Sequence, residues 1–160
     1  MLYVFGYGSL IFADGANKRT PRVYTDQDFV EARLLGYRRE FNAVYDNMRF
    51  LGLIEHADWE VNGTLLPLNE KHFNDFADSE CSNVGSSTPL YNFIDVTSKI
   101  IILDNTFKLG IDDRVITCVT VKPSLNGNIP DYYLKILMNA LITRGREFES
   151  EFWKTTYVIG

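Results

Sequence analysis

The sequence predicts a single α+β domain over residues 1–160, built on a closed or strongly bent, mostly antiparallel sheet with flanking helices. Most apolar segments alternate with period two, as strands do, whereas only two segments carry apolar residues at helical spacing. A chain of 160 residues that is 46% hydrophobic and 23% charged can bury a sizeable core. Neither a repeat nor a low-complexity stretch divides the chain.

The first predicted strand begins almost at the N-terminus and runs into a glycine loop, Tyr-Val-Phe-Gly-Tyr-Gly-Ser-Leu over residues 3–10. Gly6 and Gly8 allow a tight turn, with positive φ accessible to both, and leave no side chain to crowd a ligand. Successive N–H groups in such a turn form a concave site for a carboxylate or phosphate. Ser9 adds a hydroxyl, and Tyr7 adds an aromatic wall with a polar tip.

The glycine spacing excludes two kinds of nucleotide-binding motif. No third glycine follows at the dinucleotide-binding spacing, and no Gly-Lys-Ser/Thr follows for a phosphate-binding Walker loop. A ligand other than a nucleotide therefore fits the loop better. The alternative is an ordinary strand end whose glycines serve only the turn.

The next segments predict further strands and a short helix. After an irregular stretch over 11–28, residues 30–37 and 38–45 alternate as two strands, with a bulge or bend at Gly36. Residues 50–55 and 59–68 predict two more strands. Asn69 is an N-cap for a helix over 70–78.

The second half of the chain predicts three strands and a longer helix. A loop of small residues covers 81–89, and strands are predicted over 90–97, 99–103 and 114–122. Pro130 opens a helix that continues to Arg144. Gly145 follows as a C-cap or helix break.

Composition narrows the function classes. A formal net charge of −5 argues against general nucleic-acid binding, and no apolar run reaches the roughly 20 residues that span a bilayer. No signal peptide is evident, and the only cysteines, Cys81 and Cys118, fit a reducing cytosol. With two histidines and no cysteine cluster, we expect no zinc site, no other metal and no cofactor.

Glu80 and Asp78 are the candidate general bases. Asp78 ends the predicted short helix and Glu80 follows it, both in an apolar context, and partial desolvation would raise a carboxyl pKa toward the range useful for a base. A solvated helix-terminal carboxylate is the alternative, and spacing does not choose between the two residues. Nucleophilic catalysis is less favoured, because Cys81 has no adjacent base and Ser9 lacks the nucleophile-elbow pattern.

The remaining charged and histidine residues predict structural roles. Arg38 and Arg39, like the Lys18–Arg19 pair, are expected to be solvated or in local salt bridges. His56 and His72 are expected to be satisfied surface or core residues.

Six segments together resemble the gamma-glutamylcyclotransferase-like family, which includes AIG2-like and ChaC-like proteins. The family's substrate loop resembles Val4–Leu10, and its Ala-x-Leu-x-Gly-Tyr strand resembles Ala32–Phe41. The segments that match in chain order are residues 4–10, 32–41, 61–68, 76–80, 90–96 and 130–145. The correspondence covers nearly the whole chain.

This resemblance implies a barrel-like sheet of five to seven strands with flanking helices and a cavity. It implies a cyclotransferase that converts a gamma-glutamyl amine, amino acid or peptide to 5-oxoproline and a released amine. Glu80 would be the general acid/base. Tyr7, Gly8, Ser9 and Leu10 would form the substrate cradle, largely through backbone donors, and the pocket hydroxyls would be those of Tyr91 and Tyr133.

The resemblance further implies a cytoplasmic protein, monomeric or homodimeric, whose partner is a small gamma-glutamyl molecule rather than nucleic acid or a membrane. The chain departs from the family pattern at Ala77, where the family has Asp, and at Cys81, where Gly is common. The usual Arg two residues after Tyr91 is replaced by Phe93, and the loop before Tyr91 is longer than usual. Two alternatives therefore stay open: a catalytically silent protein that binds a small ligand in the same pocket, and a structural or interaction module.

Overall fold

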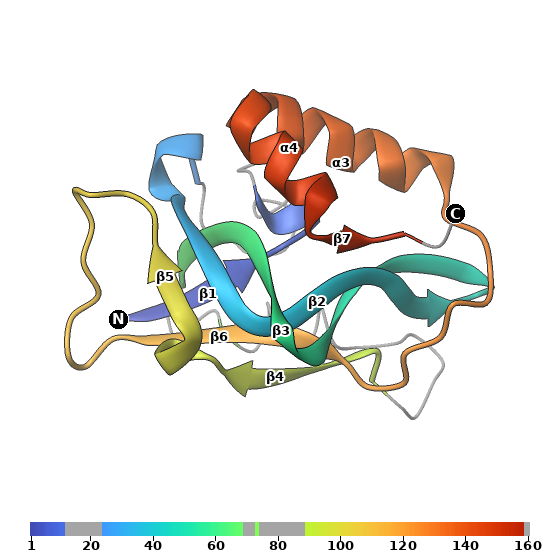
Figure 1. Ribbon diagram of the computed structural model, residues 1–160, viewed down its shortest axis with the longest axis horizontal. Coiled ribbons are helices and arrows are strands. Elements are labelled where there is room, and N and C mark those ends of the chain that lie inside the picture. The colour runs from blue at the N-terminus through green and yellow to red at the C-terminus, as the bar shows by residue number, and fades with distance from the viewer. Residues whose placement is uncertain (12–23, 69–72, 74–88, 159–160) are drawn as a thin grey trace.

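The computed structural model describes residues 1–11, 24–68, 73 and 89–158 (Figure 1). Of the predicted helix over 70–78, only Phe73 falls within these residues. Of the predicted loop over 81–89, only Pro89 does. Glu80 and Asp78 therefore lie outside the described residues.

The described residues form a seven-stranded mixed sheet in the order β4-β6-β1-β3-β2-β5, with β7 also paired to β2. The parallel pairings are β1 with β6 and β2 with β7, and the other pairings are antiparallel. The sheet is strongly bent and does not close, so the α+β prediction is confirmed in its open form. The strands are β1 (Leu2–Gly6), β2 (Val30–Tyr45), β3 (Met48–Leu68), β4 (Tyr91–Asp95), β5 (Ile100–Ile102), β6 (Arg114–Thr120) and β7 (Thr156–Tyr157).

Two long strands replace the four predicted over residues 30–68. The predicted bulge at Gly36 exists, with φ of +82° and a register shift between Leu35 and Tyr37, but the hydrogen-bonded ladder continues across it. Asp46 and Asn47 join β2 to β3 with φ of 49° and 60°. Two successive positive φ values match the right-handed twist of a tight hairpin. β3 pairs first with β2 and then, over residues 64–68 at its end, with β1.

Two helices lie side by side over one face of the sheet (Figure 1). The predicted helix is α3 (Asp131–Arg144), with Pro130 as its N-cap and Gly145 at φ +103° as its C-cap. The chain then starts α4 (Arg146–Lys154), a helix that the sequence analysis missed. Three 3-10 turns complete the described structure: η1 (Ser9–Ile11), η2 (Asp26–Asp28) and η4 (Thr97–Lys99).

The main core lies between the sheet and the two helices. Leu137 and Leu141 of α3 and Phe152 of α4 are fully buried against residues such as Phe5 of β1. The opposite face of β1 and β3 forms a smaller apolar cluster that includes Val4. β1 is therefore buried on both faces, and the glycine loop leaves the sheet from its interior.

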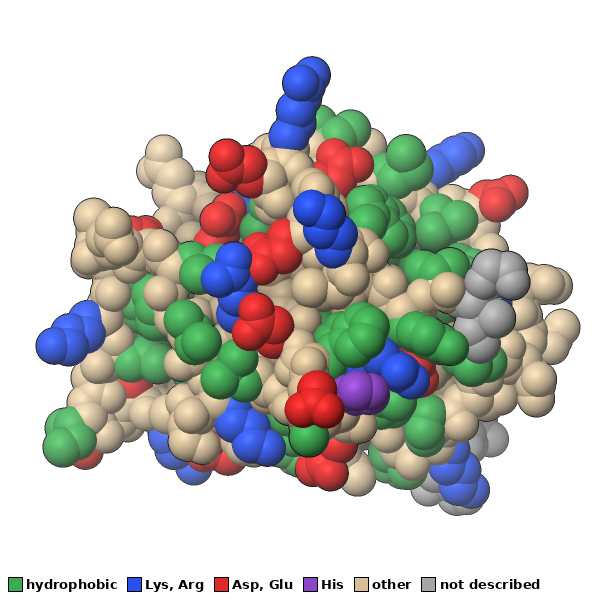
Figure 2. Space-filling view, in the orientation of Figure 1, with side chains coloured by type: hydrophobic (Ala, Val, Ile, Leu, Met, Phe, Trp, Pro, Cys, Tyr) green, Lys and Arg blue, Asp and Glu red, His purple; other side chains and the backbone are tan. Residues whose placement is uncertain are grey.

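The surface in Figure 2 mixes basic and acidic side chains over the whole visible face. This distribution agrees with the modest net charge of −5. None of the helices within the described ranges is long and apolar enough to cross a membrane.

Candidate functional site

The glycine loop follows β1 without a break. Gly6 pairs with Thr64 of β3, and the chain then turns into η1, where the N–H of Ile11 donates to the carbonyl of Gly8 at 3.1 Å. The loop is therefore attached to the centre of the sheet at its first residue and closed by its own hydrogen bond at its last.

The two loop glycines are needed for close packing rather than for left-handed backbone. Neither Gly6 nor Gly8 has positive φ, so that expectation was wrong. A Cβ added at Gly6 would lie 2.9 Å from the Cβ of Leu10. A Cβ added at Gly8 would lie 3.3 Å from the hydroxyl of Tyr133 and 3.5 Å from Cδ1 of Leu51. The loop thus packs directly on α3 and β3.

The Tyr7 side chain enters the core. It is buried, and its hydroxyl donates a hydrogen bond to the carbonyl of Cys118 on β6 at 2.8 Å. This contact joins the loop to a strand 111 residues further along the chain. Tyr7 therefore anchors the loop through its side chain, and its polar tip bonds to the neighbouring strand.

The other two predicted tyrosines meet at Leu51. The hydroxyl of Tyr91 donates to the carbonyl of Leu51 at 2.7 Å, and the hydroxyl of Tyr133 accepts from the N–H of Leu51 at 3.2 Å. Among the described strands, β3 pairs at this position with β2 alone, and two tyrosine hydroxyls bond to its other edge. The rings of Phe41 and Phe50 each make a T-shaped contact with the Tyr133 ring.

The structure therefore brings together three segments that the sequence analysis assigned to one site. Residues from the loop, from β4 and from α3 converge on Leu51 of β3. Gly8 and Tyr133 are neighbours. Tyr91 and Tyr133 both form hydrogen bonds with the main chain of Leu51. Glu80 lies outside the described residues, so it is not placed relative to this cluster.

Arg39 is a residue of this region whose role was predicted wrongly. We expected a solvated or salt-bridged side chain, but Arg39 is completely buried. Its Nε donates to the carbonyl of Tyr7 at 2.9 Å, and its Nη1 donates to the carbonyl of Phe152 at 3.0 Å. Nη2 donates to the carbonyl of Asn62. Burial lowers the pKa of Arg39 to about 9. This pKa is still above neutral pH, so the guanidinium is charged there.

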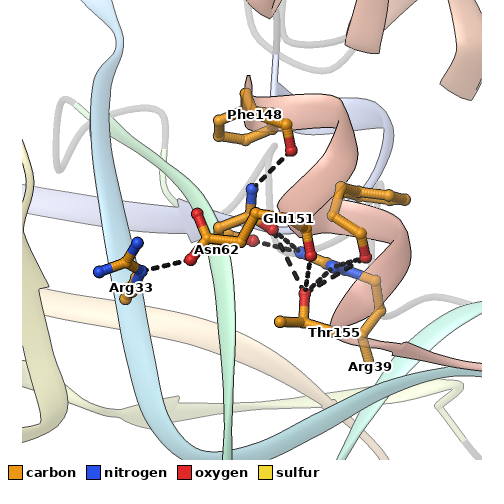
Figure 3. A network of polar contacts seen from close by, with 7 residues as sticks. Arg33, Arg39, Asn62, Phe148, Glu151 and Thr155 are labelled. Atoms are coloured by element: carbon orange, nitrogen blue, oxygen red, sulfur yellow. Dashed lines mark hydrogen bonds and ion pairs between the residues drawn. The ribbon is translucent and has the colours of Figure 1, made fainter. Parts of the chain in front are cut away.

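Figure 3 shows how α4 and the strands β2 and β3 surround this guanidinium. Asn62 donates in turn to the carbonyl of Phe148 at 3.0 Å, and the hydroxyl of Thr155 accepts from Arg39 at 3.1 Å. Nearby, the guanidinium of Arg33 pairs with the carboxylate of Glu151. A signal for Arg39 was present in the sequence: Tyr37, Arg39 and Phe41 share one face of a strand, and two of the three are aromatic.

Arg38 behaves as predicted, in a local ion pair. It contacts the buried carboxylate of Glu40 at 3.2 Å, and its guanidinium lies 4.1 Å from the ring centroid of Tyr157. Glu40 continues into a buried network: Asn42 donates to it at 3.0 Å, and Thr120 donates to Asn42 at 2.6 Å. This network was not predicted.

A separate pocket of about 420 Å³ opens on the other side of the molecule's central strands. None of the predicted site residues that fall within the described ranges lines it. Its lining residues are Leu2, Phe73, Phe93, Ile94, Asp95, Arg114 and Ile116. Phe93 packs against Phe73 with ring centroids 5.5 Å apart.

No group of three or more His, Cys, Asp or Glu side chains that could hold a metal ion occurs within residues 1–11, 24–68, 73 and 89–158. His56 packs edge-on against Trp59. Cys118 is buried in the core and forms no disulfide with another described residue.

Similar folds occur among solved structures. A structure described as gamma-glutamyl cyclotransferase superposes with a TM-score of 0.68 at 16% identity, over 94% of this chain and 83% of that one. The chain has the gamma-glutamyl cyclotransferase-like fold. YkqA from Bacillus subtilis shares the fold with a TM-score of 0.66 at 15% identity, over 96% of this chain and 53% of YkqA.

A human protein described as uncharacterised has the gamma-glutamyl cyclotransferase-like fold as well, with a TM-score of 0.67 at 16% identity. The superposition covers 93% of this chain and 83% of the human chain. No family model and no curated protein matches this sequence. The fold predicted from the six motifs is therefore confirmed by structure rather than by sequence similarity.

Proposed function

We propose that this protein is a cyclotransferase that converts a gamma-glutamyl amine, amino acid or peptide to 5-oxoproline and the corresponding free amine. The observation that carries the proposal is the convergence of Gly8, Tyr91 and Tyr133 on Leu51. These residues come from three distant segments, each matching a motif of the gamma-glutamylcyclotransferase-like family, within a fold of that type.

In the proposed reaction, the α-amine of the substrate attacks its own γ-carbonyl carbon. A C–N bond forms to close a five-membered ring, and the C–N bond to the leaving amine breaks. Glu80 takes a proton from the attacking nitrogen and returns it to the departing nitrogen, so that no water or other reactant is consumed. Because nucleophile and electrophile belong to one molecule, the protein mainly has to fold the substrate and stabilise the oxyanion.

The cradle is assigned to Tyr7, Gly8, Ser9 and Leu10, with backbone N–H groups as the donors to the γ-glutamyl group. In the described structure, the Tyr7 carbonyl is held by Arg39 and the Gly8 carbonyl by Ile11. Both acceptors of the turn are thus bonded within the protein, which favours presenting its donors to a ligand. Gly8, next to Tyr133, leaves space that any larger residue would fill.

The test is a screen of the purified protein against gamma-glutamyl amino acids, gamma-glutamyl amines and glutathione, with 5-oxoproline detected by mass spectrometry. Glu80→Gln keeps the side-chain shape and removes the base, so product should fall by at least about a hundredfold while the thermal unfolding midpoint is retained. Asp78→Asn is the matched control and should keep its activity. Activity that survives in Glu80→Gln and disappears in Asp78→Asn would transfer the role to Asp78.

A second candidate is a binding protein that holds a small carboxylate in the same cradle without turnover. Phe93 favours it, because this residue places an apolar ring against Phe73 where related enzymes carry an arginine. Thermal stabilisation by 5-oxoproline that is equal in the parent protein and in Glu80→Gln, with no product from the panel, would support this candidate.

A further inference from the structure

The buried guanidinium of Arg39 does more than connect α4 to the sheet. Its Nη groups bond to Asn62, Phe152 and the hydroxyls of Thr155 and Thr156. Only its Nε reaches the glycine loop, at the carbonyl of Tyr7. The single contact with the loop is therefore separable from the contacts that hold the C-terminal segment.

This contact fixes the orientation of one peptide group. The carbonyl of Tyr7 and the N–H of Gly8 belong to the same peptide unit, and none of the described peptide bonds is cis. In a trans peptide the carbonyl and the N–H point in opposite directions. A carbonyl held toward Arg39 therefore turns the Gly8 N–H away from the guanidinium.

The contact also changes the strength of that N–H as a donor. Hydrogen bonds from a charged donor are roughly twice as strong as neutral ones, and hydrogen bonds in a chain polarise one another. Among the described residues, Arg39 forms no ion pair with an acidic side chain, and its donors bond to carbonyl and hydroxyl oxygens. The Tyr7 carbonyl is one of these acceptors, and its polarisation by Arg39 strengthens the N–H of Gly8 as a hydrogen-bond donor.

We infer that Arg39 is a positioning residue of the candidate site: it holds the Tyr7–Gly8 peptide in the orientation that directs the Gly8 N–H into the substrate cradle. The inference rests on the proposed function for the identity of the cradle's ligand. The orientation of the peptide is a property of the protein alone, and it can be measured without any substrate.

Arg39→Lys tests the role. Lysine keeps the positive charge but has one compact head group, which cannot replace an Nε donor and two Nη donors at once. Thr156→Val is the matched control, because it removes one acceptor of the Arg39 Nη1, at 3.2 Å, and leaves the Nε contact intact. Thermal unfolding measures the global stability of both variants, so that their other properties can be compared.

The first readout is amide hydrogen exchange measured residue by residue by NMR. After correction for the change in global stability, the amide of Ile11, which donates to the Gly8 carbonyl and closes the loop, should exchange about tenfold faster in Arg39→Lys than in Thr156→Val. Equal corrected rates in the two variants would overturn the inference. Should Arg39→Lys fail to fold, the parent protein decides: exchange of the Arg39 Nε–H at the solvent rate would also overturn it.

The second readout is steady-state kinetics on the substrate found in the screen. Arg39→Lys should raise KM about tenfold with kcat changed much less, because the cradle donors bind the γ-glutamyl group before and during ring closure. Thr156→Val should leave KM unchanged. If the parent protein turns over no panel member, the proposed function fails, while the exchange rates still decide the role of Arg39.

Discussion

The hydroxyl of Tyr91 donates a hydrogen bond to the main-chain carbonyl of Leu51 at 2.7 Å, across 40 residues of chain. This bond lies on the edge of β3 that pairs with none of the described strands at Leu51. Tyr133 bonds to the N–H of the same residue. Two side chains thus provide what a strand partner would otherwise supply, and they hold β4 and α3 close to the glycine loop.

Tyr91→Phe should lower the free energy of unfolding by about 1–2 kcal/mol, because it leaves the buried Leu51 carbonyl without this donor. Chemical denaturation monitored by tryptophan fluorescence measures the loss. Tyr157→Phe, at a partly exposed position, serves as the control and should stay within about 0.5 kcal/mol of the parent protein. A Tyr91→Phe variant as stable as this control would show that the Leu51 edge needs no side-chain donor.

Gly8→Val should abolish turnover of the gamma-glutamyl substrate. The Cβ alone would lie 3.3 Å from the Tyr133 hydroxyl, and the two methyl groups of valine require still more space. Initial rates measured at saturating and at low substrate, beside a thermal melt, test this expectation. Gly8→Ala adds only the Cβ and should keep partial activity. Full activity in Gly8→Val would contradict the assignment of the cradle to this loop.

Gly52→Ala should destabilise the fold by about 1–3 kcal/mol through overpacking. A Cβ at this position would fall well inside contact distance of the Thr120 hydroxyl and the Asn42 amide oxygen. These two groups share a buried hydrogen bond, so they have no free space into which to move. Gly110→Ala, on an exposed turn, is the comparison in the denaturation experiment. Equal stability of the two variants would mean that the Asn42–Thr120 pair adapts without cost.

Asp95→Asn should reduce the loss of stability in acid. Hydrogen bonds from the hydroxyl and N–H of Thr97 lower the pKa of Asp95 below its ordinary value of 3.8. A carboxyl whose pKa is lower in the folded state stabilises the fold above pH 3.8, and this contribution disappears as the pH falls through the folded-state pKa. Denaturation at a series of pH values should give a shallower slope below about pH 4 in the variant. Parallel slopes would indicate that the Thr97 contact contributes nothing to acid sensitivity.

Local patterns explain which elements could be predicted. Pro130 and Gly145 enclose an apolar period of 3.6, so the bounds of α3 follow from fixed φ at one end and positive φ at the other. The helix α4 was missed because charged residues dominate its nine positions, and only Phe148 and Phe152 are buried. Their spacing of four residues is too short a signal to outweigh the glycine that precedes the helix.

In the candidate site, too, local motifs identified residues, whereas contacts between distant segments could not be predicted. The glycine loop, Tyr91 and Tyr133 were identified from motifs, but their meeting point at Leu51 depends on the pairing of β3, which no local pattern contains. Arg39 was misassigned because an arginine in a polar-looking sequence is usually solvated, whereas here main-chain carbonyls from three segments receive its donors. The role of Glu80 stays a prediction.

The buried thiol of Cys118 offers a direct way to observe the region behind the glycine loop. Its own carbonyl is the acceptor of the Tyr7 hydroxyl, and its residue is only 5% exposed. In a Cys81→Ser background, Cys118 is the sole sulfhydryl of the chain. Its side chain packs with Ala43 and Tyr91, so the rate at which an alkylating reagent labels it reports how often this packing opens.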